Sequence, residues 1–280
     1  TLGLLMTKGL NYGIDFSGGT LVQLQTEKAV PIGDIRVQMF DAGYEGLIIQ
    51  EYGSPTEILV RVPSEIMPEG GGEVTTKTAQ ALANALENMA GNTQVRRVEF
   101  VGPQIGQELK RKGFLAVLFS ALAILAYVSI RFEFRFALGA LVALLHDVVI
   151  TIGVFSFLQK EISMPVLAAF LTILGYSLND TIVVFDRVRE NMGRFKKKTF
   201  IEVLNLSVNE MLNRTLMMTV TTAIVLLALF FYGGEVIHNF AFALLVGVIV
   251  GTYSSVYIAS PIVWWMGTKK KDDTDVNSNN

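Results

Sequence analysis

The most prominent feature of the hydrophobic pattern is a set of five long apolar runs in the second half of the chain. They cover residues 113–130, 136–158, 164–185, 216–232 and 240–266. A membrane-spanning helix needs about 20 mostly apolar residues, because it rises roughly 1.5 Å per residue through a core of about 30 Å. A core helix of a soluble protein is the alternative for any single run. Five in succession, separated by charged turns, predict a polytopic α-helical membrane protein with five complete transmembrane helices.

Residues 11–112 show shorter periods. Strands are predicted at 21–25, 47–50, 58–62 and 94–101, and helices at 31–43 and 74–89. One face of the first helix would hold Ile32, Ile35, Met39 and Phe40, and one face of the second Ala79, Leu82, Leu86 and Met89. The glycines at 70–72 predict a flexible loop. The order βαββαβ is typical of a small α+β ferredoxin-like domain, a fold that by itself does not indicate a function.

These patterns divide the chain into four parts. Residues 1–6 are apolar but too few to span, and we interpret residues 1–10 as the end of a truncated first transmembrane helix; a disordered artificial extension is the alternative. Residues 11–112 form the βαββαβ domain. Residues 113–268 form the helical bundle, with an amphipathic segment at 187–213, and residues 269–280 are a tail.

Composition and charge exclude several classes of protein. Of 280 residues, 51% are hydrophobic and only 17% are charged, against roughly 25% in soluble globular proteins. A single soluble domain and a disordered chain are therefore excluded, and no extended basic face remains for nucleic acid. The absence of Cys excludes disulfides, thiolate metal sites and a Cys nucleophile. We expect no enzymatic activity, no cofactor and no metal.

The positive charges of the short loops predict the orientation. Residues 131–135, residues 187–198 and the tail carry eleven Lys and Arg and lie on one side if the runs alternate, whereas the opposite loops carry only Lys160. The side with more Lys and Arg should be the cytoplasm. Residues 11–112 would then be periplasmic and the C-terminus cytoplasmic. The amphipathic segment would lie on anionic lipid at the inner interface, or serve as a docking site for a cytoplasmic motor.

Ionisable residues inside or next to the apolar runs are the candidates for a chemical function. Asp147 lies in the middle of the second run beside His146, Asp180 lies in a polar island at 176–181, and Arg214 precedes the fourth run. Low-dielectric surroundings favour a protonated carboxyl, and a nearby Arg favours the carboxylate. A carboxyl held between these influences can bind and release a proton, so Asp180, Arg214 and Asp147 are candidates for a proton relay. The alternative for each Asp is a structural hydrogen bond to a neighbouring helix.

Two further features have ordinary interpretations. His146 can be a packing hydrogen-bond donor or a relay member, and no second His stands four residues away to suggest zinc. Gly247 and Gly251 form a G-x-x-x-G pair in the last run, which predicts close helix packing; an open pore is the alternative.

Five stretches together resemble the SecD and SecF proteins, accessory subunits of the bacterial protein-export translocon. They are residues 11–20 (NYGIDFSGGT), 98–103 (VEFVGP), 143–147 (ALLHD), 175–190 (GYSLNDTIVVFDRVRE) and 213–215 (NRT). The first resembles the family signature G-[IL]-D-F-x-G-G, and the run 176–190 is more similar to SecF than to SecD. The similarity extends from residue 11 to about 267.

The resemblance implies a SecF-like subunit of the bacterial inner membrane, related to the resistance–nodulation–division superfamily. It implies six membrane helices and several partners: a SecD-like subunit, the SecYEG channel, a YajC-like small subunit, translocating preprotein and membrane lipids. It implies that proton-motive force drives translocation through Asp180 and Arg214, while Asp147 matches a family motif of less defined role. Structural or interface roles are expected for Asp15, Gly18, Gly19, Asn179, Gly247 and Gly251.

Two other functions stay open from the sequence. A half-transporter of the same superfamily could export a small molecule or lipid, although its outer domain would be larger and duplicated. A passive scaffold could merely stabilise the channel.

Overall fold

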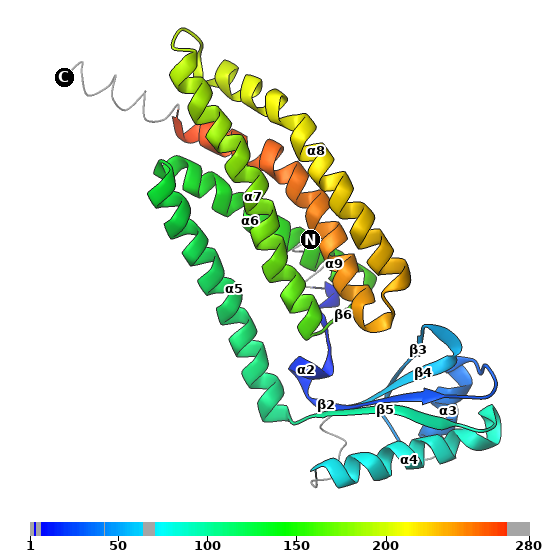
Figure 1. Cartoon of the computed structure of the whole chain (residues 1–280). Coiled ribbons are helices and arrows are strands. Elements are labelled where there is room, and N and C mark those ends of the chain that lie inside the picture. The colour runs from blue at the N-terminus through cyan, green and yellow to red at the C-terminus, as the bar shows by residue number, and fades with distance from the viewer. Residues whose placement is uncertain (1–2, 4–6, 42, 64–70, 268–280) are drawn as a thin grey trace. The chain divides into compact units, whose positions relative to one another are not determined.

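Five long helices carry the apolar runs in the computed structural model, which describes residues 3, 7–41, 43–63 and 71–267 (Figure 1). They are α5 (Pro103–Arg131), α6 (Phe134–Leu158), α7 (Met164–Arg194), α8 (Phe200–Tyr232) and a last helix. The last helix consists of α9 (Glu235–Ser254), the π-helical turn η1 (Ser255–Ala259) and a continuation to Gly267. All five are long and apolar enough to cross a membrane, which confirms the predicted fold class.

The chain divides into two compact units. The membrane unit comprises the described residues up to 11, residues 114–160 and residues 165–267. The ferredoxin-like unit comprises residues 12–113 together with residues 161–164, from the connection between α6 and α7. Half of the predicted end of a first membrane helix at 1–10 (residues 1, 2 and 4–6) lies outside the described residues, and so does the whole tail at 269–280.

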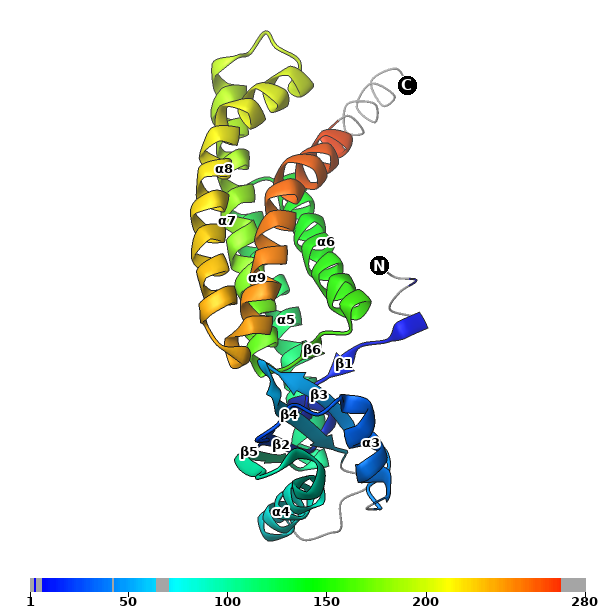
Figure 2. The same ribbon diagram turned by 90° about the vertical axis from the view of Figure 1, so that its right-hand side faces the viewer.

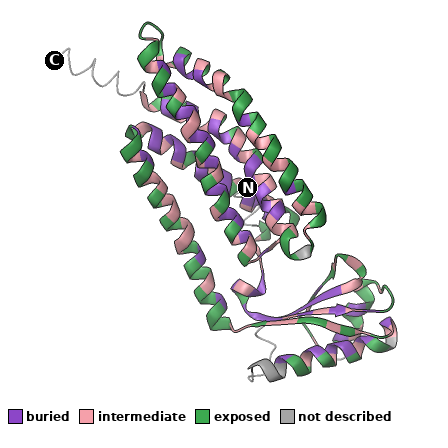
Figure 3. Ribbon diagram, in the orientation of Figure 1, coloured by how far each residue is buried: buried purple, intermediate pink, exposed green. Residues whose placement is uncertain are grey.

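Burial separates the central helices of the membrane unit from the peripheral ones. In the apolar stretches of α5 and α8, only 11% of the residues are buried. In those of α6, α7 and the last helix, 39% to 50% of the residues are buried. Figure 3 shows the buried residues gathered on these three helices. α8 and α9 run side by side (Figures 1 and 2). The outer faces of α5 and α8 are therefore available to lipid or to other membrane proteins.

The glycine pair of the last helix allows a close approach to α7. A Cβ added at Gly247 would lie 2.3 Å from the side chain of Ile173, and one added at Gly251 would lie 3.1 Å from Cβ of Ser177. Ile173 and Ser177 are four residues apart and share a face of α7, so the two helices meet along this stripe. This is the close packing that the motif predicts.

The ferredoxin-like unit is a four-stranded antiparallel sheet with the strand order β3-β4-β2-β5. The elements follow one another as β2 (Gly19–Gln25), α3 (Ile32–Asp41), β3 (Ile48–Tyr52), β4 (Ser54–Val62), α4 (Gly71–Ala90) and β5 (Gln94–Val101). Val22 pairs with Val60 on one side and with Val98 on the other. The core joins Val22 and Val60 to buried side chains of both helices, Met39 and Leu82 among them. The predicted βαββαβ order is confirmed.

Several local expectations were wrong. Phe40 is 60% exposed, because successive residues on a helix point about 100° apart and its neighbour Met39 takes the core position. Gly71 and Gly72 belong to the first turn of α4 rather than to a loop; Gly70 lies outside the described residues. Three short elements were not predicted. They are the strands β1 (Asn11–Tyr12) and β6 (Glu161–Ile162), which pair with each other, and the helix α2 (Ile14–Ser17), which follows β1. None of the three has enough residues for a periodic signal.

The amphipathic segment predicted at 187–213 is divided between two membrane helices. α7 continues to Arg194, and α8 begins after Thr199, whose hydroxyl and backbone N–H both donate to the Glu202 carboxylate at 2.8 Å. This capping box fixes the start of α8. Leu204 is buried in the core of the membrane unit, whereas Ile201 is 43% exposed. The apolar face of the segment therefore packs in part on the protein itself.

Candidate functional site

Two carboxyl groups are buried in the membrane unit. Asp147 on α6 is fully buried, and Asp180 on α7 is 9% exposed. A buried charge is costly unless hydrogen-bonded or paired, so the partners of these groups decide what they can do.

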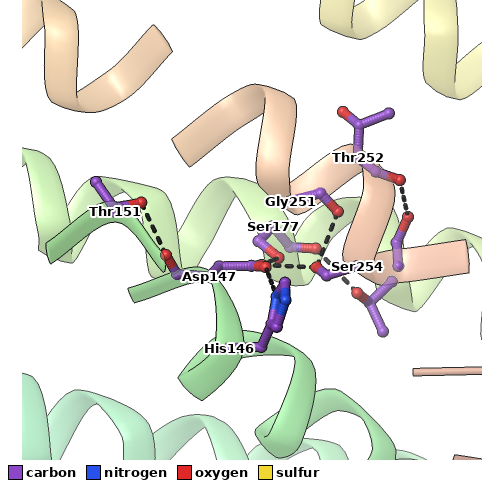
Figure 4. A network of polar contacts seen from close by, with 9 residues as sticks. His146, Asp147, Thr151, Ser177, Gly251, Thr252 and Ser254 are labelled. Carbon is purple, nitrogen blue, oxygen red and sulfur yellow. Dashed lines mark hydrogen bonds and ion pairs between the residues drawn. The ribbon is translucent and has the colours of Figure 1, made fainter. Parts of the chain in front are cut away.

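Asp147 accepts hydrogen bonds from two other helices (Figure 4). The Ser177 hydroxyl donates to its Oδ2 at 2.6 Å from α7, and the Ser254 hydroxyl donates to the same atom at 2.8 Å from the last helix. His146 Nδ1 lies 3.1 Å from Oδ1. Thr151 donates to the backbone carbonyl of Asp147 and not to its carboxylate. Asp147 thus joins three helices mainly through neutral hydroxyl groups.

Asp180 has the same kind of environment. The Thr215 hydroxyl on α8 donates to Oδ1 at 2.6 Å, and the Ser255 hydroxyl of η1 donates to Oδ2 at 2.6 Å. Each buried carboxyl is therefore bound by two hydroxyls from two different helices. Because a hydroxyl can donate or accept, such a partner suits both a charged and a neutral carboxyl.

The predicted pairing of Asp180 with Arg214 is not formed in this structure. Arg214 is exposed, and among the described residues it makes no ion pair with Asp180. The reason is its place on α8: Arg214 and Thr215 are successive residues, about 100° apart, and Thr215 is the one that points to Asp180. Arg214 therefore lies one residue from the site and faces outward.

Other candidate residues also lie away from the carboxylates. The Tyr176 hydroxyl donates to the Met218 carbonyl and lies 3.1 Å from the Thr222 hydroxyl, so Tyr176 binds α8 rather than Asp180. Asn179 is exposed. Gly251 makes room for Ser177, which donates to Asp147, because a Cβ at Gly251 would lie 3.1 Å from Ser177 Cβ and 3.3 Å from its Oγ. The described residues contain no group of three His, Asp or Glu that could hold a metal.

Four hydroxyl residues of the site were missed by sequence reasoning: Ser177, Thr215, Ser254 and Ser255. Ser and Thr are common in membrane helices, where their hydroxyls also bond to the preceding turn, so their presence alone signals little. The adjacent Ser254 and Ser255 were the available signal. They lie where the last helix changes from α to π geometry, and such single π turns occur frequently at functional sites.

Residues of the signature stretch at 11–20 form a second polar cluster, inside the ferredoxin-like unit. The Asp15 carboxylate accepts a hydrogen bond of 2.7 Å from the backbone N–H of Met164. Gly18 and Gly19 have φ of +73° and +117°, a conformation that favours glycine. The buried Arg61 guanidinium donates to the Tyr12 carbonyl and, at 3.3 Å, to the Ser17 hydroxyl.

Glu161 of β6 belongs to this cluster. Burial raises the pKa of Glu161 above its ordinary value of 4.5; the nearby Arg61 opposes the rise and Asp15 adds to it. A raised pKa means that the folded unit prefers the neutral acid. The contribution of Glu161 to stability is therefore fully present below pH 4.5 and is lost as the pH rises through the raised value.

We predict that Glu161→Gln removes this pH dependence. The amide is neutral at every pH, so the variant should become more stable than the original protein as the pH rises above about 5. The measurement is amide hydrogen exchange of β2 and β4 in the full-length protein between pH 5 and 8, corrected for intrinsic exchange. Glu51→Gln, an exposed carboxylate of the same unit, is the control and should leave the slope unchanged. Equal slopes for the original protein and Glu161→Gln would contradict the prediction.

Comparison with known proteins agrees with this architecture. The family model described as "Protein export membrane protein SecD/SecF, C-terminal" matches residues 81–269, and the "SecD/SecF GG Motif" model matches residues 3–30. The protein translocase subunit SecF of Pseudomonas aeruginosa is 46% identical over 97% of this chain and 86% of its own length. That of Magnetococcus marinus is 49% identical over 95% and 86%.

A crystal structure of SecDF from Thermus thermophilus, described as a translocon-associated membrane protein, has the same fold. Its TM-score is 0.85 at 38% identity, covering 95% of this chain but only 36% of that longer one.

The fold and the buried site define a polytopic membrane protein with a ferredoxin-like domain and two buried carboxyls in its apolar helices. The chain belongs to the SecD/SecF family of protein-export membrane proteins, on its SecF side.

Proposed function

We propose that this chain works with a SecD-like partner to promote protein translocation across the bacterial inner membrane, and that the proton-motive force drives this work through Asp180. The relatives named as SecF translocase subunits support the first part. The SecD-like partner is supported by the SecDF structure, in which this chain covers only 36% of a single longer chain.

One observation carries the proton-coupling part of the proposal. Asp180 is buried in a membrane helix and is held by two neutral hydroxyls, with no cation bonded to its carboxylate among the described residues. Ionisable groups inside membranes frequently mark ion pathways. A carboxyl without a fixed counter-ion can change its protonation state, which a permanently paired one cannot do easily.

Asp147 and Arg214 have subsidiary roles in the proposal. Asp147 has a matching hydroxyl environment, and the Ser177 that binds it lies three residues before Asp180 on α7. Arg214 would modulate Asp180 when α8 turns, since rotation by one residue would bring it to the position that Thr215 now holds. An Arg there would favour the charged carboxylate and the release of its proton.

Orientation and the remaining partners complete the proposal. The distribution of Lys and Arg supports a periplasmic position for the ferredoxin-like unit and a cytoplasmic C-terminus. The weakly buried outer faces of α5 and α8 offer surface for the SecD-like partner and lipids. SecYEG, a YajC-like subunit and the preprotein are further proposed partners. The half-transporter alternative is not favoured, because the relatives compared are translocase subunits.

The proposal is tested in a bacterial host depleted of its own SecF. Expression of this chain should restore the processing of exported preproteins in a pulse–chase measurement. The restored fraction should disappear when an ionophore collapses the proton gradient, after subtraction of the same treatment in cells with an empty vector. Restoration that survives the ionophore would instead support a passive scaffold, and no restoration would contradict the translocation role.

A further inference from the structure

Two consecutive serines contact the two buried carboxyls. Ser254, the last residue of α9, donates to Asp147, and Ser255, the first residue of η1, donates to Asp180. Both serines are fully buried. Two adjacent residues of the last helix therefore bond to two different carboxyls, one on α6 and one on α7.

Each of these serines has a second acceptor within reach. The Ser254 hydroxyl lies 3.1 Å from the Gly251 carbonyl oxygen, and the Ser255 hydroxyl lies 3.0 Å from the Thr252 carbonyl oxygen. A hydroxyl has one proton, so it can donate to only one of its two acceptors at a time. The arrangement gives each serine two orientations with a satisfied hydrogen bond.

The other two hydroxyls differ in this respect. In the hydrogen bonds recorded between described residues, Ser177 and Thr215 donate only to the carboxylates. They can stabilise the charged carboxylate, but they have no alternative acceptor there. The two-acceptor arrangement is thus specific to the serines at the α-to-π junction.

We propose that Ser254 and Ser255 are positioning residues that rotate with the protonation of Asp147 and Asp180, so that both carboxyls stay hydrogen-bonded whether charged or neutral. This inference rests on the proposed function and adds the groups that make it possible. When the carboxylate is charged, the serine donates to it. When a proton binds, forming a carboxyl O–H, that O–H donates to the serine oxygen, and the serine proton turns to the backbone carbonyl.

The proton balance of this step is simple. One O–H bond forms on the carboxyl when the proton arrives, and it breaks when the proton leaves. The serine O–H bond does not break at any point; only its direction changes. Without the rotation, the O–H of a neutral Asp180 would meet a serine that is itself donating, at the cost of an unsatisfied polar group. Asp147 has a further polar partner at its other oxygen, His146 Nδ1.

Five titratable side chains lie within four residues of the two carboxyls or of their four hydroxyl partners along the chain. They are His146 on α6, Tyr176 on α7, Arg214 on α8, and Tyr253 and Tyr257 on the last helix. Of these, only His146 bonds to a buried carboxylate among the described residues. The protonation of Asp180 should therefore respond chiefly to its two hydroxyl partners.

The test is infrared spectroscopy of the full-length protein in lipid nanodiscs. The C=O band of protonated Asp180, assigned by its loss in Asp180→Asn, is titrated against pH. Ser255→Ala removes a hydrogen bond from both forms of the carboxyl. The bond to the charged form is about twice as strong as the bond to the neutral form, so the midpoint should rise, by about one pH unit or less. Ser255→Thr keeps the hydroxyl and should restore the midpoint. Ser254→Ala should shift the Asp147 band in the same way.

Ser156→Ala removes another fully buried serine, whose hydroxyl bonds to the Gly9 carbonyl and to no carboxylate, and it should shift neither band. If the bands titrate but neither serine variant moves them, the serine inference is overturned and the proposed function stands. If no aspartate band titrates at all, both fail.

Discussion

Replacing Asp180 by Asn should remove the proton-dependent part of protein export while the protein stays folded. The Asn oxygen can accept from Thr215, and the Ser255 hydroxyl can turn to the Thr252 carbonyl, so the variant keeps its hydrogen bonds. The amide cannot bind and release a proton in the working pH range. We expect the ionophore-sensitive export rate to fall by about tenfold or more, equivalent to at least roughly 1.4 kcal/mol in the barrier.

The control for this prediction is Asp186→Asn on the same helix. The Asp186 side chain is 57% exposed and forms an ion pair of 3.4 Å with Arg131. An exposed pair of this kind contributes little to stability, and its loss should leave export near the original rate. Normal export by Asp180→Asn, at normal abundance in the membrane, would refute the proton-carrying role.

Two replacements of Asp147 should separate its structural role from its chemical one. Asp147→Asn keeps an oxygen that can accept from Ser177 and Ser254, so the folded protein should retain most of its stability. Asp147→Ala removes that acceptor and leaves a small void between three helices. The cost should be about 1–3 kcal/mol, from two membrane hydrogen bonds of roughly 0.6 kcal/mol each and the void.

The measurement is the free energy of unfolding of both variants in mixed detergent micelles, together with their export rates. A stable Asp147→Asn variant with reduced proton-dependent export would assign Asp147 to proton movement. A stable variant with normal export would confine Asp147 to packing. Equal stability of the Asn and Ala variants would contradict the hydrogen-bond network described around Asp147.

The buried carboxyls could be found from the sequence because charge inside an apolar run is exceptional. Asp147 and Asp180 stand out for this reason, and the structure buries both. Long apolar runs likewise predicted the five helices, and the alternation of apolar and polar residues predicted the strands of the sheet. In each case a strong local pattern reports burial directly, without knowledge of the neighbouring elements.

The partners of the carboxyls could not be found in the same way. Which residue of α8 faces Asp180 depends on the rotation of that helix, and Thr215 rather than its neighbour Arg214 holds the position. Ser254 and Ser255 depend on a π turn that no periodic pattern predicts. Pairing across helices is set by tertiary packing, and sequence spacing constrains only residues on one helix.

The most direct test of the central claim is proton movement itself. Liposomes are reconstituted with this protein and the membrane subunits that purify with it, loaded with a pH-sensitive dye, and given a pH gradient and a membrane potential. The account predicts a proton flux that Asp180→Asn abolishes and Asp186→Asn does not change. An equal flux in all three preparations, or no flux in any of them above that of empty liposomes, would contradict it.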